Sequence, residues 1–441
     1  MINLLNNFWV LFASLLIFLM TVAVGFLEIG ELGLKMKRSL YKSLLITGIS
    51  FIVMAIIGFN TAFAPTIGGI IGNPFYKPGF FLGSLGSPAT MFSATWWSTS
   101  SKYFGAGLWT VSYFMLEATS ASVTLALVSV VLLRKVKMAA FVTFSVVYFV
   151  LIFNLPAAWI WNPTGWLYLL GMRDFAGGLV VHGAAGIAGL AILVRIWQEE
   201  KWKGMKESPR ESFMLNHGFL TLAILLLIIG WVGFDPGNTL AFNFDTLIVV
   251  SVVLISGFTG MVSVLTTSYI LRKDTGGILN AVNGIIMGLI VITPLAGFVS
   301  PLSAFILGIL SGPLYVFADI FFSSRKWLSD PVGLLSSHMT GGIFGIVMIP
   351  FFTQHSYAVF SGNSILPNGF IFGGGVAALR TLGTEVLGIV VVVAFVFTIS
   401  YLTMSIISKA MHGILDSSEY SGTAKKVYAV SSSKAQLDKL H

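Results

Sequence analysis

The chain has 441 residues, of which 56% are hydrophobic and only 10% are charged, whereas soluble chains carry about 25% charged residues. This composition excludes a large soluble domain and indicates a polytopic membrane protein with short loops. The sequence has no cysteine, which excludes disulfides, thiol catalysis and thiolate metal sites. A net charge of +8 could indicate nucleic-acid binding, so its meaning depends on where the basic residues lie.

Apolar runs of about 20 residues, each long enough to cross a membrane as a helix, recur along the chain. Eleven such runs lie near residues 8–29, 41–60, 105–133, 138–160, 175–196, 213–234, 246–271, 277–294, 299–322, 332–352 and 380–408. Residues 61–104 are rich in Gly, Pro and aromatic residues, which predicts a loop with several turns. The first run follows no basic segment or small-residue cleavage site, so we expect it to remain as a membrane span.

Basic residues gather in alternate loops. All but four of the 25 Lys and Arg residues lie after the first, third, fifth, seventh and ninth runs or in the C-terminal tail. The exceptions are Lys77, Lys102, Arg173 and Arg380. Because short basic loops stay in the cytoplasm, we predict a multi-pass cell-membrane protein with the N-terminus outside and the C-terminus cytoplasmic. The charge therefore indicates topology, and no nucleic-acid partner is expected.

Two segments of the chain, residues 174–189 and 330–345, read alike. In each, an aspartate is followed by seven residues, a histidine, three more residues and then Gly-Ile-x-Gly. The segments open the fifth and tenth runs, and a repeat of five spans must insert its second copy upside down. We therefore predict an all-α fold of eleven transmembrane helices, with an inverted repeat of spans 1–5 and 6–10 followed by a long eleventh helix.

The two histidines of this repeat, His182 and His338, are candidate pore residues. If the segment from each aspartate is helical, each histidine lies about 12 Å into a ~30 Å hydrocarbon layer, so the imidazoles should meet near its middle. One histidine in an apolar helix is usually a packed core residue, whereas a symmetric pair favours a functional site. Asp174 and Asp330 are explained as helix N-caps, Asp330 with Pro331 behind it, and Asp174 is also a candidate vestibule residue.

Several motifs resemble those of the ammonium transporter (Amt/Mep/Rh) superfamily. They are the runs at residues 174–182, 230–238, 283–301 and 330–342, and an early run at 25–30 is similar to the first helix of one subgroup. The resemblance extends from about residue 8 to about 410. It implies a homotrimer in which each subunit encloses a narrow apolar pore lined by hydrogen-bonded histidines, here His182 and His338.

The resemblance also implies a mechanism. Ammonium is recruited at an outer aromatic cup, loses its proton, and passes the histidines as ammonia. A dry apolar pore is costly for a hydrated cation, whereas neutral ammonia loses far less solvation. Trp161 matches the cup tryptophan, where an indole can make a cation–π contact, although an interfacial anchor explains it equally well. Phe234 matches one of the two gating phenylalanines.

Three positions depart from the family pattern. Ser120 stands where the other gating phenylalanine is expected, Asn238 replaces the serine that binds the recruited cation, and Asp235 replaces an asparagine. Asparagine still offers an amide oxygen to ammonium. Glu117 lies within a membrane span and is a candidate recruitment residue that compensates for the altered cup, unless it only contacts a polar group of a neighbouring helix.

The end of the chain has a different composition. Residues 411–441 are polar and predict a flexible cytoplasmic tail after a transmembrane domain of residues 1–410. Residues 413–422 faintly resemble the tail motif of the family, which implies a PII-type regulatory partner.

Three functions from different classes remain open. An ammonium transporter or ammonia channel leads, and the alternative is an ammonium sensor that binds substrate with little or no conduction. A membrane enzyme or metal protein would need His217 and His355 to join the histidine pair, but these residues lie near opposite ends of the predicted spans, and two histidines alone make a poor metal site. We therefore expect no enzyme activity, no metal and no cofactor.

Overall fold

The computed structural model describes residues 2–33, 36–76, 94–97, 107–132, 135–204, 215–325, 327–328, 330 and 332–416, except for the side chains of residues 2, 3 and 38. Within these ranges ten helices are long and apolar enough to cross a membrane, and one shorter apolar helix accompanies them. Each coincides with one of the eleven runs predicted from the sequence, so the predicted all-α membrane fold is confirmed.

The first half of the chain contributes five spans. They are α1 (Ile2–Leu32); α2 (Met36–Val53) with η1 (Met54–Gly58) and α3 (Phe59–Phe63); α6 (Thr110–Leu132); α7 (Met138–Val147) with η2 (Tyr148–Ile152) and α8 (Asn154–Ile160); and η3 (Gly178–Gly183) with α10 (Ala184–Trp202). The predicted loop 61–104 begins later than expected, because α3 continues to Phe63. It then forms a small hairpin of β1 (Thr66–Ile67) and β2 (Ile71–Gly72), and residues 77–93 and 98–104 lie outside the described ranges.

The second half of the chain supplies six spans. They are α11 (His217–Gly237), α12 (Phe244–Arg272), α13 (Gly277–Ile292), α14 (Pro301–Ser323), η4 (Leu335–Met339) with α15 (Thr340–Phe352), and α17 (Gly375–Ala410). Short helices α9 (Trp166–Leu170), α16 (His355–Phe360) and η5 (Phe370–Phe372) lie between them. The eighth run forms the shorter helix, since α13 has 16 residues.

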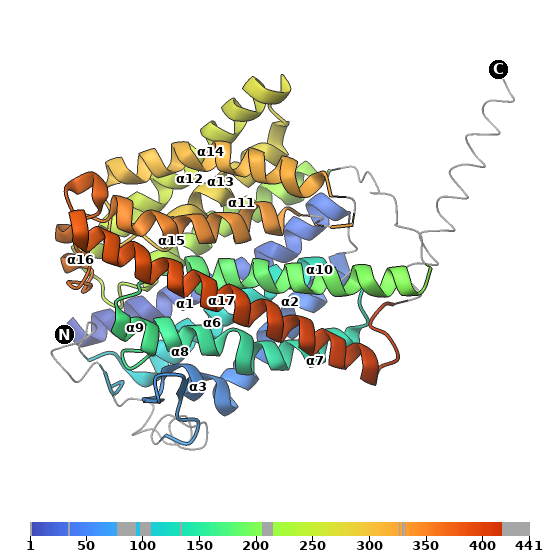
Figure 1. Ribbon diagram of the computed structural model, residues 1–441, viewed down its shortest axis with the longest axis horizontal. Helices are drawn as coiled ribbons and strands as arrows, with labels where there is room; N and C mark the ends of the chain where they lie inside the picture. Colours follow the sequence, from blue (N-terminus) through green and yellow to red (C-terminus); the bar gives the residue numbers. More distant parts are fainter. Residues whose placement is uncertain are drawn as a thin grey trace, which may run out of the picture.

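The long helices lie side by side, and α17, drawn in red, crosses them obliquely (Figure 1). We call the end of the bundle that holds the start of α1, α9 and α16 the N-face, and the end that holds residues 199–204 and 411–416 the C-face. At the C-face, Glu199 accepts hydrogen bonds from the backbone amides of Ile414 and Leu415. The first residues of the predicted tail are therefore fixed to α10, and residues 417–441 lie outside the described ranges.

The two halves pack as an inverted repeat would. Helix α1, the first span of one half, packs along α11, the first span of the other. The π-helix η3 packs on α15, and η4 packs on α10. The contacts are reciprocal, because Gly186 of α10 lies against Met339 of η4 and Gly342 of α15 lies against Gly178 and Gly183 of η3. Glycine at these crossings lets two helix backbones meet without an intervening side chain.

The assumption of a continuous helix from each aspartate to its histidine is wrong. Residues 174–177 are not helical, and both histidines lie in π-helical turns, η3 and η4, that open their spans. Each aspartate instead folds back onto the first turn as a cap, as described below. The histidines are therefore brought together by the crossing of two helix starts, and not by eight residues of regular helix.

A buried ion pair joins α1 to α2 near the C-face. The Lys42 ammonium contacts the Glu28 carboxylate, both side chains are fully buried, and the Ser39 hydroxyl donates to Glu28 Oε2 over 2.6 Å. A buried charge is retained only when it is paired and hydrogen-bonded. This cluster therefore fixes the first two spans against each other.

The glycine crossing makes a stability prediction. A Cβ atom at Gly342 would overlap the Gly178 carbonyl oxygen, a backbone atom that cannot rotate away. We expect Gly342→Ala to destabilise the protein by about 1–3 kcal/mol, the usual cost of overpacking. The measurement is thermal unfolding in detergent. Gly48→Ala is the control, since a Cβ there meets nothing within 4 Å, and equal melting temperatures for the two variants would contradict the prediction.

Candidate functional site

The structure brings the two histidines of the repeat into contact. His182 Nδ1 and His338 Nδ1 are 3.1 Å apart, and the ring centroids are separated by 5.1 Å. Two ring nitrogens can share a hydrogen bond only when one carries a proton and the other does not. His182 Nε2, which is buried, has no hydrogen-bond partner in the described part of the chain. The pair therefore leaves one imidazole nitrogen available to a small molecule.

Aromatic side chains of α11 pack against this pair. The Trp231 ring stacks on His182 at 5.2 Å and 18°, and the Phe234 ring lies 5.9 Å from it. The Trp231 indole donates to Thr293 Oγ1 over 3.1 Å. His182 and Trp231 are almost fully buried. A molecule bound at the pair is therefore surrounded mainly by apolar side chains.

Aspartates cap both π-helical turns. The carboxylate oxygens of Asp174 accept the amides of Gly177, Gly178, Leu179 and Val180 over 2.7–3.0 Å. Those of Asp330 accept the amides of Leu334 and Leu335 over 2.9 and 2.8 Å. Burial raises the pKa of the Asp174 carboxyl, and the four amide bonds oppose that rise. Each aspartate thus lies against the opening turn of its span.

A hydroxyl from α6 holds the turn that carries His182. Thr124 Oγ1 lies 3.0 Å from the Val181 carbonyl oxygen and 2.8 Å from the Tyr148 hydroxyl. Because Thr124 has one hydroxyl proton, it donates to Val181 and accepts from Tyr148. The Val181 carbonyl also accepts the Ala184 amide, so the Thr124 hydroxyl is a second donor and ties α6 to this turn.

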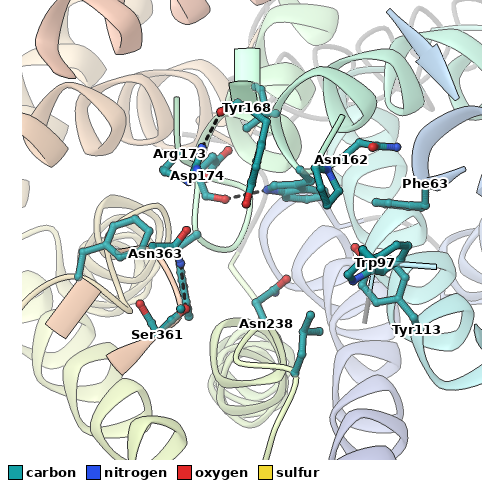
Figure 2. A pocket seen from close by; sticks show the side chains of 17 residues that line it. Phe63, Trp97, Tyr113, Asn162, Tyr168, Arg173, Asp174, Asn238, Ser361 and Asn363 are labelled. Carbon is teal, nitrogen blue, oxygen red and sulfur yellow. Dashed lines mark hydrogen bonds between the residues drawn. The ribbon is translucent and has the colours of Figure 1, made fainter. Parts of the chain in front are cut away.

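A pocket of about 140 Å³ lies on the N-face; we call it the N-face pocket. Trp161, Asp174 and Asn238, three of the residues selected from the sequence, line it. Figure 2 shows Asn238 rising toward the cavity from below, with Trp97 and Tyr113 on one side and Ser361 and Asn363 on the other. The Trp161 indole donates to the Asp174 backbone oxygen over 2.7 Å. The expected cup residues therefore lie around one cavity.

Ser120 and Glu117 do not line this pocket. The Ser120 hydroxyl donates to the Leu116 carbonyl over 2.8 Å within α6. The Glu117 carboxyl lies beside the hydroxyl of Tyr113, which does line the pocket. Glu117 Oε2 is buried and has no partner among the described residues. Glu117 therefore reaches the N-face pocket only through Tyr113.

His217 and His355 lie far from the pair. His217 begins α11 at its exposed end, and His355 on the N-face lies 2.6 Å through Nδ1 from the Leu366 carbonyl oxygen. In the described ranges no three His, Asp or Glu side chains are grouped so that they could hold a metal ion. The geometry offers no support for the metal-protein alternative.

Sequence reasoning missed three residues of the site: Trp231, Thr293 and Tyr113. Two of them had a usable signal, because Trp231 lies three residues before Phe234 and Tyr113 lies four before Glu117, spacings that put side chains on one helix face. Thr293 had no local signal, since its contact with Trp231 joins the end of α13 to α11.

Comparison with known proteins identifies the family. The model of the Ammonium Transporter Family matches residues 8–430, so the chain belongs to this family of transporters. Ammonium transporter 3 of Dictyostelium discoideum is 27% identical over 440 residues, which covers 95% of this chain and 94% of that protein. The ammonium transporter of Bacillus subtilis (strain 168) is 28% identical over 412 residues, with 91% and 92% covered.

Solved structures share the fold. Saccharomyces cerevisiae Mep2 superimposes with a TM-score of 0.76 at 24% identity, covering 91% of this chain and 84% of that chain. A sensor Amt protein superimposes with a TM-score of 0.78 at 23% identity, covering 95% and 96%. The family resemblance expected from the sequence motifs is thus confirmed.

The two aspartate caps allow a matched comparison. Replacing Asp174 with Asn turns one acceptor into a donor that faces the amides of Leu179 and Val180. We expect Asp174→Asn to cost about 1–2 kcal/mol, the upper range for a lost cap. Asp330→Asn should cost less, because among the described residues Asp330 accepts two amides and Asp174 accepts four. Thermal unfolding of both variants in detergent checks this. The expectation fails if Asp330→Asn is the more damaging change.

Proposed function

We propose that this protein conducts ammonium across the membrane by passing neutral ammonia through the histidine pair. The observation that carries the proposal is the 3.1 Å contact between His182 Nδ1 and His338 Nδ1, with His182 Nε2 left without a partner in the described chain. A neutral imidazole nitrogen can accept a hydrogen bond from ammonia or donate one to it. The apolar side chains around the pair disfavour the entry of any ion that keeps its charge.

The N-face pocket is the proposed recruitment site. The Trp161 ring offers a cation–π contact, and Asn238 offers an amide oxygen to the N–H groups of ammonium. The Asn238 Nδ2 group donates to the Phe234 carbonyl over 2.9 Å, which orients the amide. Asp174 places a carboxylate beneath the same pocket. These groups together favour a small cation with N–H donors.

Phe234 is proposed to close the path between the pocket and the histidines. Its ring lies 5.9 Å from His182, and Phe234 precedes Asn238 by four residues, one helical turn toward the pair. Ser120 takes the place of a second gating ring, so a single aromatic ring closes the path in this proposal. The ring must rotate for ammonia to pass, which keeps water and ions out between passages.

The assembly and orientation follow the family resemblance. We propose a homotrimer in the cell membrane, with the N-face outside and the C-face in the cytoplasm, as the basic loops predict. The transport path then runs from the outside pocket to the cytoplasm within each subunit. A PII-type protein is the proposed regulatory partner at the cytoplasmic face.

Reconstituted protein tests this function. We would record ammonium-triggered currents and internal pH in proteoliposomes, and compare the wild type with a His182→Ala, His338→Ala double variant. Losing the hydrogen bonds of the pair should change the signal about tenfold or more. His217→Ala, at the exposed start of α11, is the histidine control. No wild-type signal above protein-free vesicles, from folded protein, would overturn conduction and favour the sensor alternative.

Glu117 is proposed to assist recruitment through Tyr113. The Glu117 carboxyl lies behind the N-face pocket, beside the hydroxyl of Tyr113. We expect Glu117→Gln to raise the ammonium concentration that gives half-maximal transport several-fold, with a smaller change in Tyr113→Phe, which keeps the carboxylate. The measurement is the concentration dependence of the proteoliposome signal. An unchanged half-maximal concentration in Glu117→Gln would rule out this role.

A further inference from the structure

Asp235 is a buried acid that has no part in recruitment, capping or the histidine contact as proposed so far. It lies in α11 with no exposed surface. Its Oδ2 is 3.3 Å from Thr293 Oγ1, and its Oδ1 has no hydrogen-bond partner in the described part of the chain. A carboxylate in such surroundings is costly unless a cation or several donors compensate it. Its position needs an explanation.

Asp235 lies between the N-face pocket and the histidine pair. Asp235 follows Trp231 by four residues and precedes Asn238, the C-cap of α11, by three. Their side chains therefore share one face of the helix. Asn238 lines the pocket, and Trp231 stacks on His182. At about 1.5 Å per residue, Asp235 is roughly 4.5 Å inward of Asn238 and roughly 6 Å outward of Trp231 along the helix.

The hydroxyl of Thr293 links the acid to the histidine pair. Thr293 Oγ1 accepts the Trp231 indole N–H over 3.1 Å and is 2.8 Å from the Leu289 carbonyl oxygen. With one proton, this hydroxyl can donate either to Leu289 or to Asp235. All three contacts of Thr293 are satisfied at once only when Asp235 carries a proton and donates it to Thr293. The network therefore accommodates both a charged and a neutral Asp235, with different donors.

The charges around Asp235 do not provide a permanent partner. Asp174 is the charged group whose field reaches it, and that field opposes a second negative charge. Glu28 and Glu31 of the neighbouring α1 lie toward the C-face, where the Gly30 carbonyl accepts the Asn216 amide. The other ionisable groups named on neighbouring helices, Glu117 of α6 and Asp245 of α12, are acids, and α13 has no ionisable side chain. None of these groups supplies a positive charge that could compensate Asp235.

We propose that Asp235 accepts the proton that ammonium gives up before ammonia reaches the histidines, an inference that rests on the proposed conduction. Asp235 first releases a proton to water in the N-face pocket. Ammonium then enters, one of its N–H bonds breaks, and an O–H bond forms at Asp235. The ion pair becomes a neutral carboxyl group and neutral ammonia, and ammonia moves on to His182. The sum is one ammonia carried inward and one proton returned to the pocket side.

Removing the carboxyl while keeping its shape tests this step. At a fixed ammonium concentration, the wild-type rate should rise about fivefold or more from pH 5.5 to 7.5, because the acid must lose its proton first. Asp235→Asn should flatten this rise to less than about twofold, and Asp235→Glu should restore it. The readout is the initial transport rate in proteoliposomes, corrected for protein-free vesicles. Asp245→Asn, at another buried aspartate, should keep the wild-type profile.

The outcomes separate this inference from the proposed function. A wild-type pH profile in Asp235→Asn, with a signal that still depends on the histidines, overturns the inference alone. Equal defects in Asp235→Asn and Asp235→Glu indicate a requirement for shape and also overturn it. No wild-type signal removes both proposals. If Asp235→Asn does not fold, Thr293→Val takes its place: it leaves the carboxyl without its partner, so the midpoint of the pH profile should shift, and an unchanged midpoint contradicts the inference.

Discussion

The structure depends on one close approach, the crossing of the helix starts η3 and η4. Gly186 and Gly342 lie where each span meets the other's opening turn, so no side chain separates the two backbones. That approach permits the 3.1 Å contact between the two imidazoles. The aspartate caps, the Thr124 hydroxyl and the Trp231 stack all hold parts of this crossing. A side chain at Gly342 would meet the backbone of Gly178 and Gly183, and one at Gly186 would meet that of Met339, so either would push an opening turn away.

Much of the fold was predictable because local sequence patterns determine it. Apolar runs located the ten long apolar helices and the one shorter apolar helix of the described residues. The repeated aspartate, histidine and glycines of residues 174–189 and 330–345 indicated both the inversion and the residues that meet. The π-helical turns were not predictable in the same way. Their form depends on partners distant in the sequence, such as Thr124 donating to the Val181 carbonyl from another span.

The candidate site also contains some residues that were predictable from the sequence and others that were not. Phe234, Trp161 and Asn238 could be selected from motifs, and the structure places them near the pair or around the pocket. The link from Trp231 through Thr293 to Asp235 could not, because it joins the ends of two helices that are far apart along the chain. Asp235 was visible only as a departure from the family pattern. Its surroundings give that departure a physical meaning, as a buried acid whose Oδ1 has no hydrogen-bond partner in the described part of the chain.

The contact between like atoms of His182 and His338 has a consequence for direction. The two halves of the chain are related by inversion, but a single shared proton cannot be, because it belongs to one ring at a time. Moving that proton exchanges donor and acceptor, but the surroundings of the two rings differ, because Trp231 and Phe234 contact His182. In the proposed conduction the shared proton therefore sets no direction by itself. Any preference for inward or outward passage then comes from the unlike surroundings and from the ammonium gradient across the membrane.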